Sequence, residues 1–186
     1  MHRSMIRERG NIRMPASGNS GPSVLFVCTE NRCRSVAAAA LWAERLPRIA
    51  EDWADWRVSS AGTWADEGEP PLRGMISLLR SRGIDVDDVR SRRLTGAMLA
   101  AHRLALVMEP NHKEALHVEF SELKGRVYLL SEPAGRETPV ADPDTDLPEA
   151  FAACLETIET LLDRGEKRIV ALARRSEAPG EGRRRT

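Results

Sequence analysis

Short apolar segments rich in β-forming residues alternate along this chain with segments of helical periodicity. Four strands are predicted, at residues 24–28, 57–62, 104–108 and 126–130. A helix between successive strands is typical of βαβ units, in which the strands lie parallel. We therefore predict an α/β fold with a single domain, a three-layer sandwich in which helices cover both faces of a four-stranded parallel sheet.

The helical segments are predicted from amphipathic spacing and from the residues at their ends. Pro70 and Gly83 bound the second helix, since Pro is favoured in a first turn and Gly just beyond a last turn. Gly165 is expected to end the fourth helix, and the segment after it, 166–175, favours a further short helix. The four predicted helices cover residues 35–46, 70–83, 110–118 and 148–165.

The charged residues are balanced, with 28 Lys and Arg against 28 Asp and Glu. This balance gives no electrostatic argument for binding to nucleic acid or to a membrane surface. No apolar run is long enough to span a membrane, and the N-terminus lacks the apolar centre of a signal peptide. We predict the domain at 23–173, between two basic tails, 1–22 and 174–186, that we expect to be disordered.

The sequence contains three cysteines, Cys28, Cys33 and Cys154. An odd, low number in a chain of this length argues against a disulfide framework and favours a reducing compartment, so we expect a cytoplasmic protein. The four His residues are scattered, and no cluster has the spacing of metal ligands. Neither a metal nor another cofactor is therefore expected.

The loop after the first strand is the strongest candidate for a functional site. Cys28 ends the strand, and Arg34 and Ser35 begin the following helix. In parallel α/β sheets ligands bind beyond the carboxyl ends of the strands, where loop N–H groups and a helix N-terminus attract an anion. An arginine adds a fork suited to phosphate, and positive surroundings favour a thiolate, which is a nucleophile. Either residue alone is more often structural, but the combination indicates phosphate chemistry.

The segment CTENRCRSV at 28–36 resembles the Cys-x-Gly-Asn-x-Cys-Arg-Ser-Pro signature of the low-molecular-weight protein tyrosine phosphatases. The resemblance covers about residues 23–164 and identifies the chain as similar to a divergent member of that family. Further similar segments follow in order: SAGT at 60–63, GID at 83–85, SRRLT at 91–95, VMEPNHKEAL at 107–116 and VADPD at 140–144.

The resemblance implies a two-step reaction. Cys28 attacks phosphorus while Asp142 protonates the leaving oxygen, and Arg34 and the loop N–H groups stabilise the negative charge. Asp142 then acts as the base for the water that hydrolyses the phosphocysteine. Pro143 stiffens the Asp142 loop, although Asp-Pro is also common in plain turns.

Other roles also follow from the resemblance. Asn31 holds the shape of the loop, Ser60 supports Asn31, and Ser35 hydrogen-bonds the thiolate. Cys33 either forms a reversible disulfide with Cys28 or packs beneath the loop. Packing is favoured for Cys154. The implied phosphate-binding and substrate-binding residues are Thr29, Glu30, Asn31, Arg32, Cys33, Ser35 and Trp64.

The chain departs from the family pattern at several positions around the loop. Glu30 stands where the family has Gly, and Arg32 where it has Ile, Val or Thr. The family His that braces Asn31 is absent. Asp144 replaces an aromatic residue that forms one wall of the phosphotyrosine slot, and Trp64 is either the opposite wall or a surface residue.

We interpret the chain as a cysteine-dependent phosphatase whose default substrate is phosphotyrosine on protein. Its partner is then a phosphorylated protein or a small phosphomonoester, with no nucleic acid and no membrane; the oligomeric state is open. The first alternative is a catalytically weakened phosphate-binding regulatory module, which Glu30 and the missing His favour. The second is arsenate reduction or phosphoarginine hydrolysis on the same loop. The absence of cysteines between Cys33 and Cys154 argues against arsenate reduction, and the presence of Arg32 argues against phosphoarginine hydrolysis.

Overall fold

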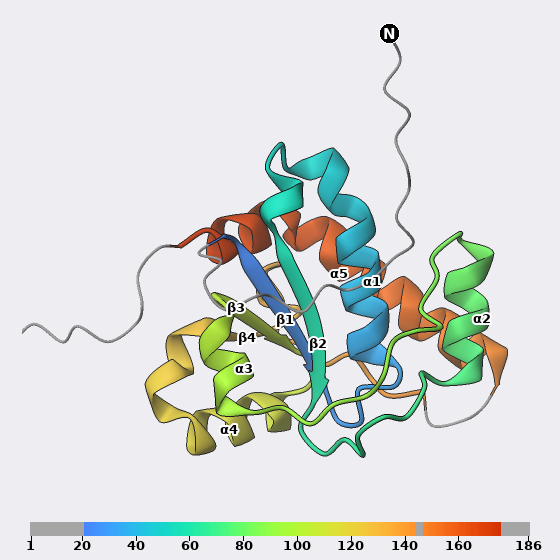
Figure 1. The fold of residues 1–186 in the computed structure, drawn as a ribbon, viewed down its shortest axis with the longest axis horizontal. Coiled ribbons are helices and arrows are strands. Elements are labelled where there is room, and N and C mark those ends of the chain that lie inside the picture. The colour runs from blue at the N-terminus through green and yellow to red at the C-terminus, as the bar shows by residue number, and fades with distance from the viewer. Residues whose placement is uncertain (1–20, 144–146, 176–186) are drawn as a thin grey trace, which may run out of the picture.

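The computed structural model describes residues 21–143 and 147–175. Its sheet has the strand order β2-β1-β3-β4, and every pair is parallel (Figure 1). The predicted four-stranded parallel sheet is therefore confirmed. The strands are β1 Ser23–Cys28, β2 Arg57–Gly62, β3 Leu104–Val107 and β4 Val127–Leu129.

Helices cover both faces of the sheet, as predicted. Alternate residues of β1 point to opposite faces, so Phe26 belongs to the core formed with α1, α2 and α5, and Val27 to the core formed with α3 and α4. The α-helices are α1 Arg34–Ile49, α2 Arg73–Ser81, α3 Gly96–Ala101, α4 Pro110–Glu119 and α5 Pro148–Ala173, and the 3₁₀ segments are η1 Trp53–Asp55 and η2 Ser121–Arg126.

The expected end of a helix at Gly165 is wrong. α5 runs without a break from Pro148 to Ala173, so the separate short helix predicted after Gly165 is its continuation. Glycine is needed here for close packing, because a Cβ at this position would lie 2.9 Å from the Cβ of Pro133. α1 likewise continues through Pro47 to Ile49, beyond its predicted end at residue 46.

The short helix α3 was not predicted. It contains only six residues, and its one clear signal is Thr95, whose side chain accepts a hydrogen bond from the Met98 N–H as an N-cap. The predicted tails lie almost entirely outside the described residues. None of the helices within 21–143 and 147–175 is long and apolar enough to cross a membrane.

The sheet register brings the carboxyl ends of the strands to one edge. Cys28 pairs with Gly62 at the end of β2, and Val27 pairs with Val107 at the end of β3. The residues that follow these strands are therefore neighbours, although they are far apart in sequence. This edge is the place where parallel α/β folds bind their ligands.

Candidate active site

The loop from Cys28 to Arg34 is held in place from outside by its neighbours. The Thr63 and Trp64 N–H groups donate to the carbonyls of Cys28 and Thr29 at 2.9 Å each, and the Leu72 N–H donates to the Arg32 carbonyl at 2.8 Å. Gly62 lies against the loop so closely that a Cβ would be 2.4 Å from the Thr29 oxygen. The loop and the end of β2 therefore form one packed unit.

Cys28 is buried at the end of β1, with its Sγ 3.0 Å from the Oγ of Ser35. Ser35 lies in the first turn of α1, and its Oγ also accepts a hydrogen bond from the Asn31 side-chain amide at 3.0 Å. Because Asn31 donates to this oxygen, the hydroxyl proton of Ser35 is available to the sulfur. The arrangement suits a thiolate as acceptor.

Asn31 adopts a left-handed backbone conformation, with φ of 57°. Such a conformation costs a non-glycine residue about 1–2 kcal/mol, and Asn is among the residues that tolerate it best. Its side chain is buried and donates to Ser60 Oγ at 2.9 Å, and its Oδ1 accepts from the Arg92 N–H at 3.1 Å. Arg92 also bonds the Ser60 carbonyl through Nε at 2.8 Å. The chain thus braces Asn31 without the family His.

Arg34 is almost wholly buried and joins three segments of the site. Its Nη1 lies 2.9 Å from a carboxylate oxygen of Glu109 and donates to the Val140 carbonyl at 3.1 Å. Its Nη2 lies 2.9 Å from a carboxylate oxygen of Asp142 and 3.2 Å from Thr29 Oγ1. Burial opposes the charge, but the hydrogen bond to Glu109 and the neighbouring anionic groups outweigh it, so the pKa of Arg34 is raised.

The structure places Asp142 at the same site as Cys28 and Arg34, across more than a hundred residues of sequence. Its side chain is 57% exposed and belongs to the rim of the site, by which we mean the exposed side chains around the Cys28 loop. Burial of the carboxyl group raises the pKa of Asp142, and the charges of Glu109 and Glu30 add to this rise, while Arg34 opposes it. A raised pKa keeps a carboxylic acid protonated to higher pH, as a proton donor requires.

Two residues of the site were missed by the sequence analysis, Glu109 and His112. Glu109 follows β3 and binds Arg34, and His112 in the first turn of α4 contacts Thr29 Oγ1 through Nε2 at 3.0 Å. Burial lowers the pKa of His112, although Glu109 opposes this shift. Glu109 could have been predicted from its position directly after a predicted strand, because such a residue lies at the carboxyl edge of the sheet.

Cys33 and Cys154 form a buried pair beneath the loop. All three cysteines are free thiols, and Cys33 at the start of α1 interacts with Cys154 on α5. This interaction and burial raise the pKa of Cys33. The contact agrees with a packing role for both residues, and the disulfide between Cys28 and Cys33 stays a prediction.

Two departures from the family signature, Glu30 and Arg32, lie at the surface of the loop, whereas a third, Val36, is buried in α1. Glu30 points to solvent and needs no left-handed conformation, since Asn31 is the only described non-glycine residue with positive φ. Arg32 lies 3.9 Å from Glu69 and donates to the Pro70 carbonyl. Trp64 is 74% exposed. Asp144 lies outside the described residues.

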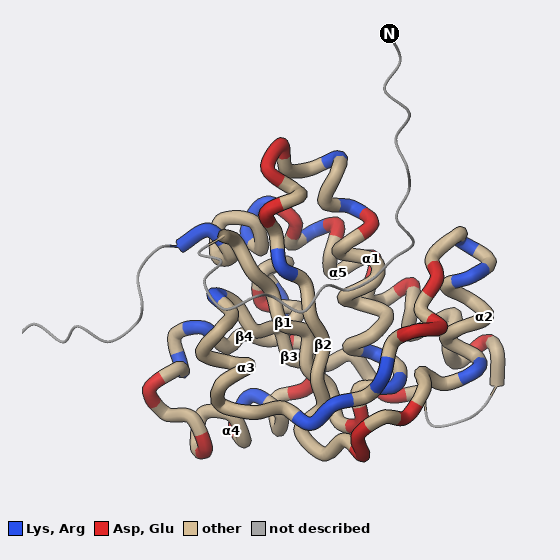
Figure 2. The backbone as a smooth tube through the Cα atoms, viewed as in Figure 1, with Lys and Arg blue, Asp and Glu red and all other residues tan. Residues whose placement is uncertain are grey.

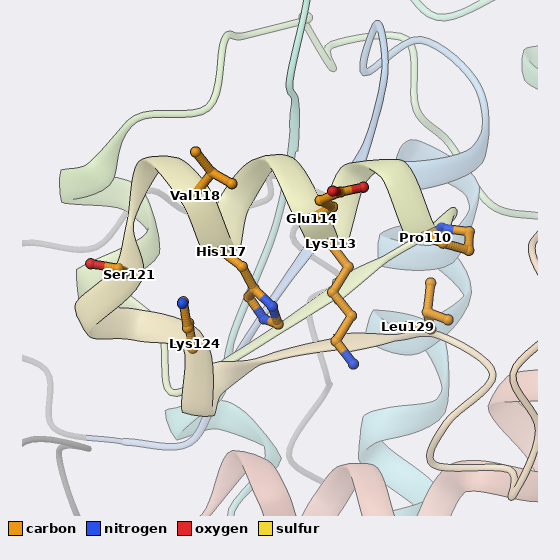
Figure 3. Close-up of a pocket in the computed structure, with 8 residues that line it drawn as sticks. All are labelled: Pro110, Lys113, Glu114, His117, Val118, Ser121, Lys124 and Leu129. Carbon is orange, nitrogen blue, oxygen red and sulfur yellow. The ribbon is translucent and has the colours of Figure 1, made fainter.

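A separate hollow is lined by residues of α4, η2 and β4 (Figure 3). His117, Lys113 and Lys124 point toward it from these elements, but none of its lining residues belongs to the Cys28 loop. Among residues 21–143 and 147–175, no group of three or more His, Cys, Asp or Glu could hold a metal ion.

A parallel sheet with a thiol and an arginine on the loop at its carboxyl edge is typical of thiol-dependent phosphatases. Residues 23–171 match the family described as low molecular weight phosphotyrosine protein phosphatase. The chain belongs to this family, whose members are phosphoric monoester hydrolases.

Individual relatives agree with the family. A probable low molecular weight protein-tyrosine-phosphatase, EpsP, of Ralstonia nicotianae is 32% identical over 81% of this chain and 97% of its own length. A protein-arginine-phosphatase of Geobacillus stearothermophilus is 33% identical over 76% of this chain and 91% of its own length. The low molecular weight protein tyrosine phosphatase of T. tengcongensis superposes with a TM-score of 0.74 at 30% identity, covering 80% of this chain and 99% of that one.

Proposed function

We propose that the chain hydrolyses phosphomonoesters through a phosphocysteine on Cys28, with phosphotyrosine on protein as the default substrate. One observation carries the proposal: a thiol, an arginine and a carboxyl group from distant parts of the chain meet at one loop. Cys28 Sγ is 3.0 Å from Ser35 Oγ, and Arg34 is 2.9 Å from Asp142. A phosphate-binding module without catalysis has no need of both the thiol and the acid.

The proposed first step forms a bond between sulfur and phosphorus and breaks the bond between phosphorus and the leaving oxygen. The Asp142 carboxylic acid gives its proton to that oxygen, while Arg34 and the loop N–H groups stabilise the charge on the phosphoryl oxygens. In the second step, water attacks phosphorus and the Asp142 carboxylate takes its proton. The bond between sulfur and phosphorus breaks, and the Ser35 hydroxyl stabilises the departing thiolate.

The exposed residues around the Cys28 loop indicate which substrate the site would accept. Trp64 offers an exposed indole face beside the loop, which suits a flat phosphotyrosine ring. Phosphoarginine is the second candidate, because a relative at 33% identity is a protein-arginine-phosphatase. Parallel assays with phosphotyrosine and phosphoarginine peptides decide between them. The free thiols support a reducing location, and we propose the cytoplasm.

Hydrolysis by wild type and by Asp142→Asn across pH tests the mechanism. We expect the substitution to lower kcat/KM for phenyl phosphate by about 10²-fold or more, because the leaving oxygen loses its proton donor. In the wild type, kcat/KM should fall as pH rises through the raised pKa of Asp142, where the acid becomes a carboxylate. Asn does not ionise, so this fall should be absent from the variant.

Two controls make the result specific to Asp142. The loss should be smaller with p-nitrophenyl phosphate, whose leaving group needs little protonation. Asp55→Asn, which changes an exposed carboxylate before β2 at the opposite edge of the sheet, should behave as wild type. An Asp142→Asn protein that kept the same alkaline fall and the same rate with phenyl phosphate would contradict the assigned role.

Glu30→Gln should move the pH profile toward acid. The negative charge of Glu30 contributes to the raised pKa of Asp142, so its removal lowers that pKa and brings the alkaline fall of kcat/KM to lower pH. Competitive inhibition by inorganic phosphate should become about twofold to threefold stronger, because the exposed negative charge of Glu30 no longer repels the phosphate anion. Glu67→Gln, another exposed residue of the rim, is the matched control, and equal profiles for both variants would count against this coupling.

A further inference from the structure

Arg93 lies at the mouth of the proposed site, on the loop between α2 and α3. Its backbone forms an isolated parallel bridge with Gly62, which in turn pairs with Cys28 across β1 and β2. Cys28, Gly62 and Arg93 are therefore successive neighbours along the carboxyl edge. Two strand spacings separate the Cα atoms of Cys28 and Arg93 by roughly 10 Å.

The side chain of Arg93 lies over one face of the Trp64 ring. Its Nε donates to the Ala65 carbonyl at 3.3 Å, and its guanidinium carbon lies 5.7 Å from the centre of the Trp64 ring. A guanidinium over an indole is a favourable cation–π contact. Arg93 is exposed and has no ion pair within 21–143 and 147–175, so its outer N–H groups face solvent beside the loop.

The other two arginines of this mouth already have different contacts. Arg32 lies 3.9 Å from Glu69, which offsets its charge. Arg92 binds the Ser60 carbonyl and supports Asn31 through its backbone. Arg93 is thus the arginine of this group that is positioned to meet an incoming anion.

Resting on the proposed function, we infer that Arg93 forms a subsite for a second negative charge on the substrate, an Asp or Glu beside the phosphorylated residue of a protein. Successive residues of an extended peptide rise by about 3.3 Å, so side chains one or two positions from a residue bound at Cys28 can reach a point roughly 10 Å away. The planar guanidinium can bind a carboxylate with two parallel hydrogen bonds.

The surroundings make this preference local. Exposed carboxylates of Asp66, Glu67 and Glu69 lie on the loop after β2, and Figure 2 shows red acidic positions near blue basic positions of the segment between α2 and α3. These carboxylates partly balance the positive charges of the neighbouring arginines. The Arg93 guanidinium, held in one place, therefore favours a peptide whose acidic side chain lies at one particular position. It does not favour every negatively charged peptide.

Two phosphotyrosine peptides test the inference, one with Glu and one with Gln on both sides of the phosphorylated residue. We expect wild type to prefer the Glu peptide by about fivefold in kcat/KM, the size of an exposed ion pair. Arg93→Gln should remove the preference. Arg90→Gln should retain it, because Arg90 is an exposed arginine of the same loop whose contacts are to the carbonyls of Asp87 and Val89.

Binding of both peptides to Cys28→Ser, with and without Arg93→Gln, separates this inference from the proposed function. Hydrolysis of the Gln peptide by wild type reports the proposed function alone, since that peptide offers Arg93 no carboxylate. If neither peptide is hydrolysed, the proposed function fails, and the ratio of Kd values still decides the subsite. Equal Kd values with Cys28→Ser, or a preference that survives Arg93→Gln, would overturn the inference.

Discussion

Replacing Cys28 with serine should abolish phosphatase activity and leave the fold intact. A serine hydroxyl is far less nucleophilic than a thiolate, and the side chain that contacts position 28 is the hydroxyl of Ser35, which is not a base. We expect kcat to fall by about 10⁴-fold or more, as when other enzymes lose their nucleophile. Serine is similar in size to cysteine and can still hydrogen-bond Ser35, so the buried end of β1 should keep its packing.

The measurement is steady-state hydrolysis of an aryl phosphate and a phosphotyrosine peptide, together with the thermal midpoint from circular dichroism. Cys154→Ser is the matched control, because it removes another buried thiol that packs on α1 from α5. We expect that variant to retain most activity. A folded Cys28→Ser protein with wild-type activity would refute the nucleophile, and a folded wild type that bound phosphate but was inactive at every pH would favour the regulatory module.

Arg34→Lys should lower kcat/KM by about 10²- to 10³-fold, the usual cost of losing one donor to transition-state charge. Lysine keeps the positive charge but loses the planar fork that binds two phosphoryl oxygens at once. It also cannot reach Glu109, Asp142 and Val140 together, as Arg34 does. The unfolding free energy should fall as well, but by less than the about 3–5 kcal/mol expected when a buried ion pair loses one partner.

Arg45→Lys is the control for Arg34→Lys. Arg45 lies on the same helix, is also buried, and binds the carboxylate of Asp163 through two nitrogens. Its variant should lose stability to a similar degree but keep kcat/KM within about threefold of wild type. If both variants lost activity equally, the effect of Arg34 would be structural and not catalytic. Urea unfolding and aryl phosphate kinetics on both proteins make the comparison.

The sheet could be predicted because β1 and β3 are short apolar runs and segments of helical character separate the strands, although β2 contains the buried serines Ser59 and Ser60. Gly165 misled the prediction, since the same residue that ends helices also permits close packing, here against Pro133. A single sequence does not show which of these two uses applies. α3 escaped notice because six residues are too few to establish a periodicity.

The site could be predicted only in part. The spacing of Cys28 and Arg34 lies within one strand-loop-helix unit, so it is visible in a local segment. The contact between Arg34 and Glu109 depends on β3 lying next to β1. The order of strands in a sheet cannot be predicted from a local sequence pattern. The bracing of Asn31 by the Arg92 backbone was equally hidden, because a backbone N–H carries no residue-specific signal.

The close contact at Gly62 limits how this enzyme can be diversified in the laboratory. Substitutions at position 62 should disrupt the loop, since even a methyl group would lie 2.4 Å from the Thr29 oxygen and 2.9 Å from the Asn31 nitrogen. Randomising this position would therefore yield few active variants. The exposed side chains of Trp64, Asp66 and Glu67 begin only two residues later. Variation there can retune substrate choice while the geometry of the loop stays constant.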